Sequence, residues 1–271
     1  MILLACDLDN TLIRSHPQVG DVPVEYYGGK VITSMSARAL ELIANLDDRV
    51  VLVPATSRSI EQYRRVNISH ERAPLYAVVS GGGVILRDNK IDEEWDVYRK
   101  SVIDAVQGEF ERLFRVLQDD VRVEKVKIID DSFIFAKSAS AQGVIDDLEY
   151  GEAFSVLRHN EKIYVLPQGI DKGTAITEVA SRLDADCIIA AGDSDLDVPL
   201  LNEADYALAP SRELAAKIAA KSAERTKSPC VLIKPETADF SAFIMKFAAD
   251  KAAYDVTLGN ALFRCNVTGA A

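Results

Sequence analysis

Short apolar runs alternate with amphipathic helical patterns over residues 1–80, and this alternation restricts the fold more than any other feature of the sequence. Ile2–Cys6, Val50–Pro54 and Leu75–Ser80 are largely apolar, as expected of strands that are buried on both faces. Between them, Ser36–Leu46 and Ile60–Val66 carry apolar residues at helical spacing. Strands and helices that alternate in this way are typical of a parallel sheet with crossover helices. The sequence therefore predicts an α/β fold with a Rossmann-like parallel sheet.

The alternation is interrupted by a segment of different character. Residues 88–164 begin with a long charged helix, and the strands after it alternate polar and apolar residues, as in an antiparallel sheet with one exposed face. From residue 165 the first pattern resumes, and residues 252–271 show no clear period. The later apolar strands are Cys187–Ala191, Tyr206–Ala209 and Cys230–Ile233. We therefore expect one domain of residues 1–87 and 165–271, with an α+β domain of residues 88–164 inserted into it.

Charge and hydropathy limit the partners of this chain. The sequence has 31 Lys and Arg against 42 Asp and Glu, a formal net charge of −11 at pH 7. A field of this sign repels phosphate backbones and anionic lipids, so we expect neither nucleic acid nor a membrane as partner. No apolar run approaches the ~18–20 residues of a membrane span, and the start Ile2–Cys6 is too short for a signal peptide. A small anionic substrate stays possible, because a local site can outweigh net charge.

Cysteine and histidine give no support for a zinc site. Cys6, Cys187, Cys230 and Cys265 lie far apart without a CxxC pair, and the three histidines are equally scattered. Three of the cysteines stand in apolar strand-like runs, which is typical of buried, inert thiols and indicates a reducing cytoplasm. The sequence also lacks the glycine motifs of phosphate loops, dinucleotide-binding turns and nucleophile elbows.

Acidic residues follow two of the predicted buried strands. Asp7 and Asp9 come directly after the first strand, and side chains two residues apart on extended backbone point to the same side. Asp193 and Asp197 follow the strand that ends at residue 191, and a helix that begins near residue 194 would let both face one point. Ligands of open α/β sheets lie at the carboxyl ends of strands. Because carboxylates are hard oxygen ligands, the two clusters predict a Mg²⁺ site.

Two further strand ends suit a phosphate group. Thr56 and Ser57 follow the strand Val50–Pro54 and offer a hydroxyl group and turn amides at the start of a helix. Lys172 stands at the N-terminus of a predicted helix, where the helix dipole disfavours a cation. An anionic partner explains a lysine at that position.

These four features, in this order, resemble the motifs of the haloacid dehalogenase (HAD) superfamily of phosphohydrolases. The DxDxT motif corresponds to residues 7–11, and the GDxxxD motif to residues 192–197. Thr56 stands at the place of the hydroxyl motif and Lys172 at that of the lysine motif. The insert between the second and third motifs resembles a C2-type cap, as in the sucrose-phosphatase, mannosyl-phosphoglycerate-phosphatase and Cof-like branches.

The resemblance implies a Mg²⁺-dependent phosphatase that hydrolyses a small phosphate monoester, above all a sugar phosphate. Asp7 would then be the nucleophile that forms an aspartyl-phosphate, and Asp9 the general acid and base. The implied phosphate-binding residues are Thr56, Ser57 and Lys172, and the implied metal ligands are Asp7, Asp9, Asp193 and Asp197. Two alternatives stay open: a phosphomutase of the phosphomannomutase type, and a catalytically weak sugar-phosphate-binding protein.

Two positions depart from the pattern of these branches. Leu196 stands where asparagine usually precedes the last aspartate, and Ser57 stands where glycine is usual. Ser57 still supplies a backbone N–H group. Leu196 removes a polar side chain near the substrate, so it bears on the rate or on the class of substrate.

Basic side chains of the cap are candidates for substrate recognition. Lys125, Lys127 and Arg158 lie on its predicted strands. The alternation of polar and apolar residues slips between Glu124 and Lys125, which predicts a β-bulge that re-aims the side chains. We expect the three basic residues to contact the substrate when the cap covers the phosphate site.

Overall fold

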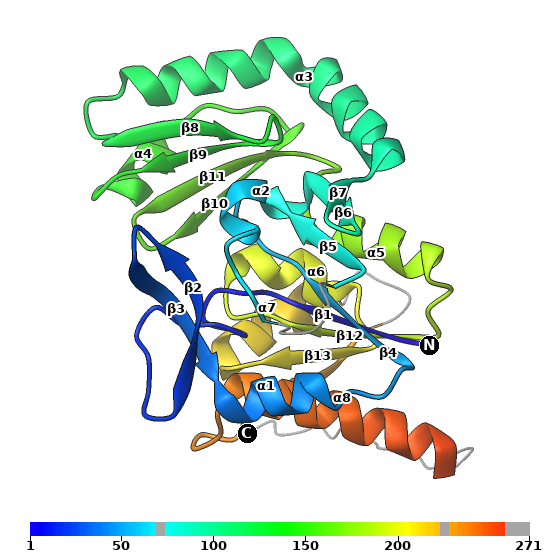
Figure 1. Ribbon diagram of the computed structural model, residues 1–271. Coiled ribbons are helices and arrows are strands. Elements are labelled where there is room, and N and C mark those ends of the chain that lie inside the picture. Colours follow the sequence, from blue (N-terminus) through cyan, green and yellow to red (C-terminus); the bar gives the residue numbers. More distant parts are fainter. Residues whose placement is uncertain (69–73, 223–227, 258–271) are drawn as a thin grey trace, which may run out of the picture.

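The computed structural model describes residues 1–68, 74–222 and 228–257. Its central sheet has five parallel strands in the order β14-β13-β12-β1-β4, which places β1 between β12 and β4 (Figure 1). The predicted α/β fold with a parallel sheet is thereby confirmed. The strands are β1 (Ile2–Cys6), β4 (Val50–Pro54), β12 (Cys187–Ala191), β13 (Tyr206–Ala209) and β14 (Cys230–Ile233).

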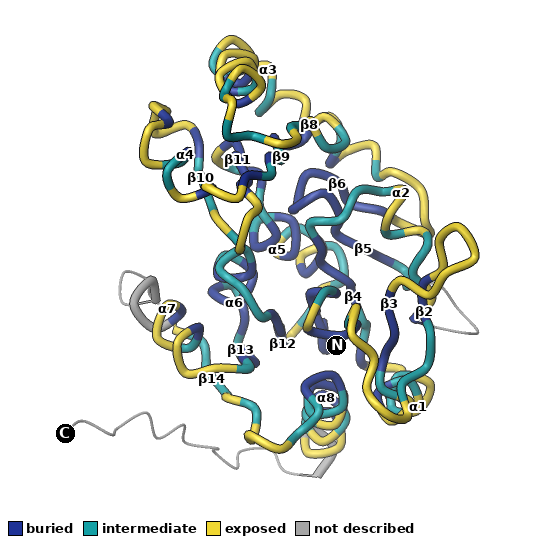
Figure 2. Tube along the Cα trace, turned by 90° about the vertical axis from the view of Figure 1, so that its left-hand side faces the viewer, coloured by how far each residue is buried: buried dark blue, intermediate teal, exposed yellow. Residues whose placement is uncertain are grey.

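Helices cover both faces of the central sheet. α5 (Lys172–Arg182), α6 (Val198–Asn202) and α7 (Arg212–Ser222) pack against one face. α1 (Ala37–Ala44) and α8 (Phe240–Thr257) pack against the other. Side chains alternate between the two faces of a strand, so an all-apolar β1 contributes to both layers. Figure 2 shows the central strands as the most deeply buried part of the molecule.

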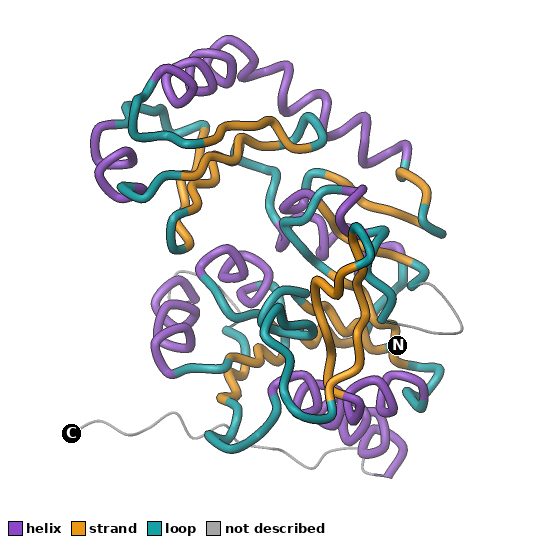
Figure 3. Tube along the Cα trace, turned by 60° about the vertical axis from the view of Figure 1, so that its left-hand side comes forward, coloured by secondary structure: helices purple, strands orange, loops and turns teal. Residues whose placement is uncertain are grey.

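A second, antiparallel sheet lies over the end of the central sheet at which β1 and β12 finish (Figures 1 and 3). Its order is β10-β11-β9-β8. One face packs against α3 (Glu93–Asp119) and α4 (Ala141–Asp147), and the other carries Phe133, Tyr164 and Leu166. The strands are β8 (Lys125–Ile129), β9 (Phe133–Lys137), β10 (Phe154–His159) and β11 (Lys162–Pro167).

The structure corrects two details of this region. The predicted bulge is wrong, because β8 begins at Lys125 and pairs with β9 residue by residue up to Ile129. The alternation slips there because Glu124 lies in the turn before the strand. β11 continues to Pro167, so a boundary after residue 164 would cut a strand of the antiparallel sheet. The division into a core and a cap domain itself stays a prediction.

Two hairpins lie outside the predicted elements. The first joins β2 (Asp21–Tyr27) to β3 (Lys30–Ser36), with register shifts on either side of Glu25. The second joins β6 (Val84–Arg87) to β7 (Lys90–Ile91) and continues the sheet of β5 (Tyr76–Val79). Three short elements complete the description: α2 (Ile60–Tyr63), η1 (Ser80–Gly82) and η2 (Asp195–Asp197).

The cysteines follow the prediction only in part. Cys6 is a buried free thiol, and burial beside Asp7 raises its pKa well above the ordinary value. Cys230 is disulfide-bonded, so the expectation of an inert thiol is wrong at that position. Cys265 and the rest of residues 258–271 lie outside the described residues. None of the helices in the described parts combines the length and the apolar character that crossing a bilayer requires.

Candidate active site

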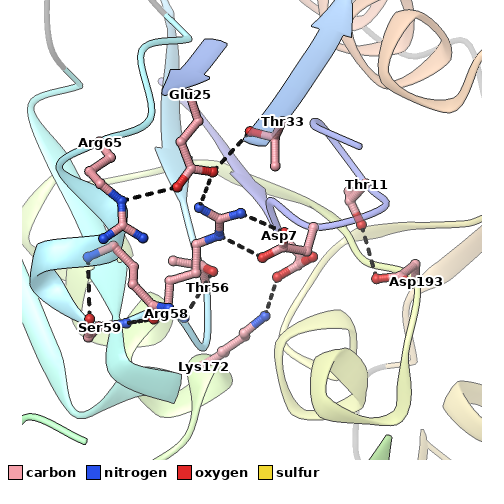
Figure 4. Close-up of polar contacts among 12 residues, drawn as sticks. Asp7, Thr11, Glu25, Thr33, Thr56, Arg58, Ser59, Arg65, Lys172 and Asp193 are labelled. Atoms are coloured by element: carbon pink, nitrogen blue, oxygen red, sulfur yellow. Dashed lines mark hydrogen bonds and ion pairs between the residues drawn. The ribbon is translucent and has the colours of Figure 1, made fainter. Parts of the chain in front are cut away.

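Asp7 emerges from the centre of the parallel sheet into a nearly closed site. Its backbone N–H group donates to the carbonyl of Ala191 over 2.9 Å, which fixes the residue beside the end of β12. Asp7 is 5% exposed, and a carboxylate so far from water needs a cationic partner. Lys172 Nζ supplies it, 2.6 Å from Asp7 Oδ1 (Figure 4). The same Nζ lies 2.6 Å from Asp197 Oδ1. One buried ammonium group therefore bridges two aspartates from two loops.

Lys172 owes its place to the start of α5. Asp171 is the N-cap residue, and its side chain accepts a hydrogen bond from the N–H group of Thr174 over 2.9 Å. Gly173 allows a close approach, because a Cβ there would lie 2.4 Å from the carbonyl oxygen of Pro199. Burial works to lower the pKa of Lys172, but Asp197 and Asp7 outweigh it and raise the pKa above its usual value. The amine therefore stays charged.

Asp197 organises the loop after β12. Its Oδ2 accepts hydrogen bonds from the N–H groups of Asp193 and Ser194 over 3.1 and 3.0 Å and from Ser194 Oγ over 2.9 Å. Gly192 makes room, because a Cβ there would lie 2.3 Å from the Asp197 side chain. Asp197 is fully buried, with one oxygen on the loop and the other on Lys172. Its contacts make it a residue that orients Lys172 and the loop.

The acidic cluster has the chemistry of a divalent metal site. Ligand oxygens of Asp7, Asp193 and Asp197 all lie within 4.8 Å of one another. Burial, with repulsion from Asp197, raises the pKa of Asp193 to about 7, and burial also raises the pKa of Asp7. Thr11 Oγ1 lies 3.5 Å from Asp193 Oδ1 (Figure 4). Because a cation among these hard oxygens would relieve the repulsion, the residues fit Mg²⁺.

Asp9 faces a different partner. Its carboxylate accepts two hydrogen bonds of 2.8 Å from Nε and Nη2 of Arg58, while Nη1 of Arg58 donates to Glu25 Oε2 over 2.8 Å. The Glu25 side chain is fully buried and also accepts from Thr33 over 3.1 Å and from Arg65 over 3.2 Å (Figure 4). Asp9 thus ends a chain of charges that begins in the β2–β3 hairpin.

Sequence reasoning missed the Arg58–Glu25 part of this chain. Arg58 stands two residues after Thr56, so its position beside a motif is a usable signal. Glu25 has no such signal, because it lies on a strand with register shifts on both sides and without clear periodicity.

Thr56 and Ser57 lie where the sequence places them, after β4. The N–H group of Ala55 donates to the carbonyl of Cys6 over 2.7 Å. Cys6 pairs with Pro54, so Asp7 and Ala55 are the first residues after the paired strands, and Thr56 is the next residue. Thr56 is fully buried, and its Oγ1 accepts from the N–H group of Arg58 over 3.2 Å. Ser57 and Tyr164 of β11 line the same small space, which brings this motif next to the antiparallel sheet.

The structure separates the three basic candidates of the antiparallel sheet. Lys127 pairs with Phe135, which pairs with Tyr164, so Lys127 shares the face that contacts Ser57. Lys125, two residues earlier on β8, lies on the same face. Arg158 pairs with Ile163 of the helix-covered layer and therefore points away from the site.

Leu196 lies between the two sheets in an apolar cluster. It packs with Leu157, Tyr164 and Leu166 of the antiparallel sheet. The space left between this cluster, Ser57 and Lys172 is about 20 Å³, room for about one water molecule. Leu196, which stands where related branches usually have asparagine, thus contacts the antiparallel sheet and covers the candidate phosphate site.

Comparison with known proteins follows the same lines. A family model described as sucrose-6F-phosphate phosphohydrolase matches residues 1–211. The solved sucrose-phosphatase of Synechocystis sp. PCC6803, in complex with sucrose and phosphate, has a TM-score of 0.60 at 17% identity and covers 94% of this chain and 98% of that chain. A protein described as a HAD/Cof-like hydrolase from Plasmodium vivax has a TM-score of 0.54 at 15% identity, covering 94% and 96%. At these identities the likeness concerns the fold.

A curated relative matches over a shorter range. The phosphoglycolate phosphatase of Methanopyrus kandleri is 28% identical over 142 residues, which is 49% of this chain and 58% of the relative. The match thus spans little more than half of the relative's length. Together with the structural neighbours, it agrees with the HAD resemblance predicted from the motifs.

Proposed function

Because the chain belongs to the sucrose-6F-phosphate phosphohydrolase family, we propose that the protein is a Mg²⁺-dependent phosphatase that hydrolyses a small phosphate monoester, above all a sugar phosphate. The observation that carries this proposal is the buried Lys172 held between Asp7 and Asp197, next to Asp193 at the end of the central strands. A nucleophilic carboxylate, a fixed cation and a set of hard oxygens are the parts that attack on a phosphate requires.

In the first step Asp7 attacks phosphorus. A bond forms between the Asp7 carboxylate and phosphorus, the bond to the ester oxygen breaks, and Asp9 gives a proton to the leaving alcohol. Lys172 and Thr56 hold the phosphate oxygens, while Asp197 keeps Lys172 in position. Asp7, Asp193 and the backbone carbonyl of Asp9 would hold Mg²⁺, which would supply positive charge that offsets the repulsion between carboxylate and phosphate.

In the second step water attacks the aspartyl-phosphate. Asp9 takes a proton from this water, inorganic phosphate leaves, and Asp7 returns to its carboxylate form. Arg58 supports both steps, because its bidentate contact fixes the orientation of the Asp9 carboxyl group. Glu25 in turn fixes the orientation of Arg58.

A screen of phosphorylated metabolites with Mg²⁺, read out as phosphate release, tests the proposal. We expect release from at least one small phosphate monoester, and none without a divalent metal. Return of the phosphoryl group to a product, dependent on an added bisphosphate, would indicate the phosphomutase instead. Saturable binding of a sugar phosphate without turnover would indicate the binding protein.

A further inference from the structure

Basic residues form one line across the antiparallel sheet. The register pairs Lys125 with Lys137, Lys137 with Lys162, and Lys162 with His159. Residues that are directly paired lie on the same face of a sheet. These four residues, here called the basic row, therefore cross all four strands side by side.

The basic row lies on the face that looks toward the candidate active site. Lys162 and Tyr164 are two residues apart on β11 and so share a face, and Tyr164 lines the same small space as Ser57 and Lys172. His159 is half-buried and close enough to Asp195 and Asp197 for their charges to act on its pKa, although burial and Lys162 lower that pKa overall. The row therefore borders the space in which a leaving group would lie.

The neighbouring line of the sheet has a different chemistry. It runs from Leu157 through Tyr164 and Phe135 to Lys127, so three of its four residues are apolar or aromatic. Leu157 and Tyr164, with Leu196, line the space beside Lys172. Two residues along a strand correspond to about 7 Å. A substrate would therefore meet apolar and aromatic side chains next to its phosphate, and ammonium groups about 7 Å farther along the strands.

The charges of the basic row are not explained by the fold. Like charges directly opposite each other on neighbouring strands are destabilising, and the row contains two such pairs, Lys125–Lys137 and Lys137–Lys162. Lys137 contacts Glu124 over 2.8 Å and Glu161 over 3.4 Å. Lys125 and Lys162 are exposed, and neither has an ion pair within residues 1–68, 74–222 and 228–257. On a chain of net charge −11, such a concentration of cations calls for an anion.

We propose that the basic row binds a second anionic group of the substrate. The substrate class is then a phosphate monoester with a carboxylate or a second phosphate at its far end, such as a phosphorylated sugar acid or a sugar bisphosphate. This inference rests on the proposed phosphatase function and narrows its substrate. Carboxylate and phosphate groups are both anions that accept hydrogen bonds from the ammonium groups of Lys125 and Lys162. Two matched pairs of compounds distinguish binding of a carboxylate from binding of a second phosphate.

The experiment compares kcat/KM within two pairs of compounds, with p-nitrophenyl phosphate as reference. The first pair is 3-phosphoglycerate and glycerol 3-phosphate, and the second is fructose 1,6-bisphosphate and fructose 6-phosphate. We expect the wild-type protein to prefer the more anionic member of at least one pair by about tenfold or more. Lys162→Gln and Lys125→Gln should each reduce that preference about fivefold. Arg158→Gln is the matched control, because it removes a positive charge from the opposite face of the same sheet.

The outcomes are distinct. If the wild-type protein prefers the less anionic member or neither member in both pairs, the basic row does not bind a second anion. Equal losses of preference in Arg158→Gln and Lys162→Gln would also overturn the proposal, because general charge rather than the row would then be responsible. Absence of phosphate release from every compound, p-nitrophenyl phosphate included, would instead contradict the phosphatase function itself.

Discussion

The central sheet and the antiparallel sheet use the same alternation of side chains in different ways. Both faces of β1 are packed under helices, so its side chains are fixed by packing and its chemistry begins only at Asp7, beyond the strand. The antiparallel sheet packs one face against α3 and α4, and its other face looks toward the site. That face can carry aromatic, apolar or basic residues without loss of the fold. We therefore expect the residues that carry out the reaction at the ends of the central strands, and the residues that select the substrate on the open face of the antiparallel sheet.

The two regions also differ in how tightly their charges are held. Asp7 and Lys172 are 5% and 3% exposed and contact each other directly, whereas Lys125 and Lys162 are exposed. Removal of one charge from a buried ion pair leaves its partner buried without an opposite charge. When an exposed charged side chain is removed, water takes its place. Substitutions at the ends of the central strands should therefore affect every substrate, and substitutions on the antiparallel sheet should change the choice among substrates.

The largest effect is expected at Asp7. Asp7→Asn removes the nucleophile and should lower kcat on every substrate by about 1,000-fold or more, which corresponds to about 4 kcal/mol in the barrier. Asp195→Asn is the control, since Asp195 is half-exposed and contacts Lys217 over 2.8 Å. Steady-state kinetics on p-nitrophenyl phosphate decide the point. An Asp7→Asn variant that keeps more than about a tenth of the wild-type rate contradicts the assignment.

A smaller effect is expected from the metal site. Asp193→Asn should raise the Mg²⁺ concentration for half-maximal activity by about tenfold, because it removes a charged oxygen from the Asp7–Asp193–Asp197 cluster. Asp195→Asn should leave that concentration within about twofold of the wild-type value. Titration of activity with Mg²⁺ measures both. Equal shifts in the two variants would show that Asp193 is not a metal ligand.

The next effect tests the chain from Glu25 to Asp9. Glu25→Gln removes the buried charge that orients Arg58, and we expect kcat to fall about fivefold with a smaller change in KM. The same variant should lose about 3 kcal/mol of stability, because two arginines lose a buried partner. Glu61→Gln, which removes the exposed partner of Arg65, is the control. A stability loss with an unchanged kcat, measured at a temperature at which the variant is folded, would give Glu25 a purely structural role.

Local patterns suffice for much of the fold and of the candidate site. Each of the five central strands is a short apolar run, and parallel strands bring their carboxyl ends to one edge, so Asp7, Thr56 and Asp193 follow strand ends at that edge. Lys172 reaches Asp7 from the start of α5. Glu25 could not be found in this way, because its strand has no period and its contact depends on how a hairpin folds back. Its partner Arg58 is 33 residues away in the sequence.

The basic candidates show a second limit of sequence reasoning. Alternation establishes that Arg158 and His159 point to opposite faces of β10. It does not tell which face the helices will cover, since that depends on how α3 and α4 pack. Alternation therefore predicts which side chains share a face, and only the tertiary structure shows that Lys125 and Lys127 lie on the face opposite the helices and Arg158 on the helix-covered face.

Leu196, where the two regions meet, should give a more modest effect. Leu196→Asn places an amide in the apolar cluster of Leu157, Tyr164 and Leu166, which costs about 1–3 kcal/mol when the amide finds no partner. The contact between the two sheets weakens, so we expect KM to rise about fivefold with a smaller change in kcat. Leu196→Met keeps the volume and should stay within about twofold. Indistinguishable kinetics of the two variants would mean that the cluster does not support substrate binding.

The smallest effect is expected at the junction of the two regions. Asp92 caps α3 by accepting from the N–H group of Trp95 over 3.0 Å, and it contacts Arg182 of α5. Burial works to raise the pKa of Asp92, but these two contacts outweigh it and lower the pKa below its usual value. A carboxyl group whose pKa is lower in the folded than in the unfolded chain stabilises the fold above its unfolded pKa of about 3.9, and the contribution disappears as pH falls through the folded pKa.

Asp92→Asn keeps a good helix cap and removes only the charge, so the sign of the effect can be read from its pH dependence. At pH 7 we expect the melting temperature to fall by about 2 °C, as for a loss of about 1 kcal/mol in a chain of this size. The difference from the wild-type protein should shrink as the pH falls below about 4 and vanish once the pH lies below the folded pKa of Asp92, because the wild-type carboxyl group is then protonated as well. Asp104→Asn, at an exposed position of α3, is the control. A difference that is equally large at pH 7 and at low pH would mean that Asp92 acts through its shape and not through its charge.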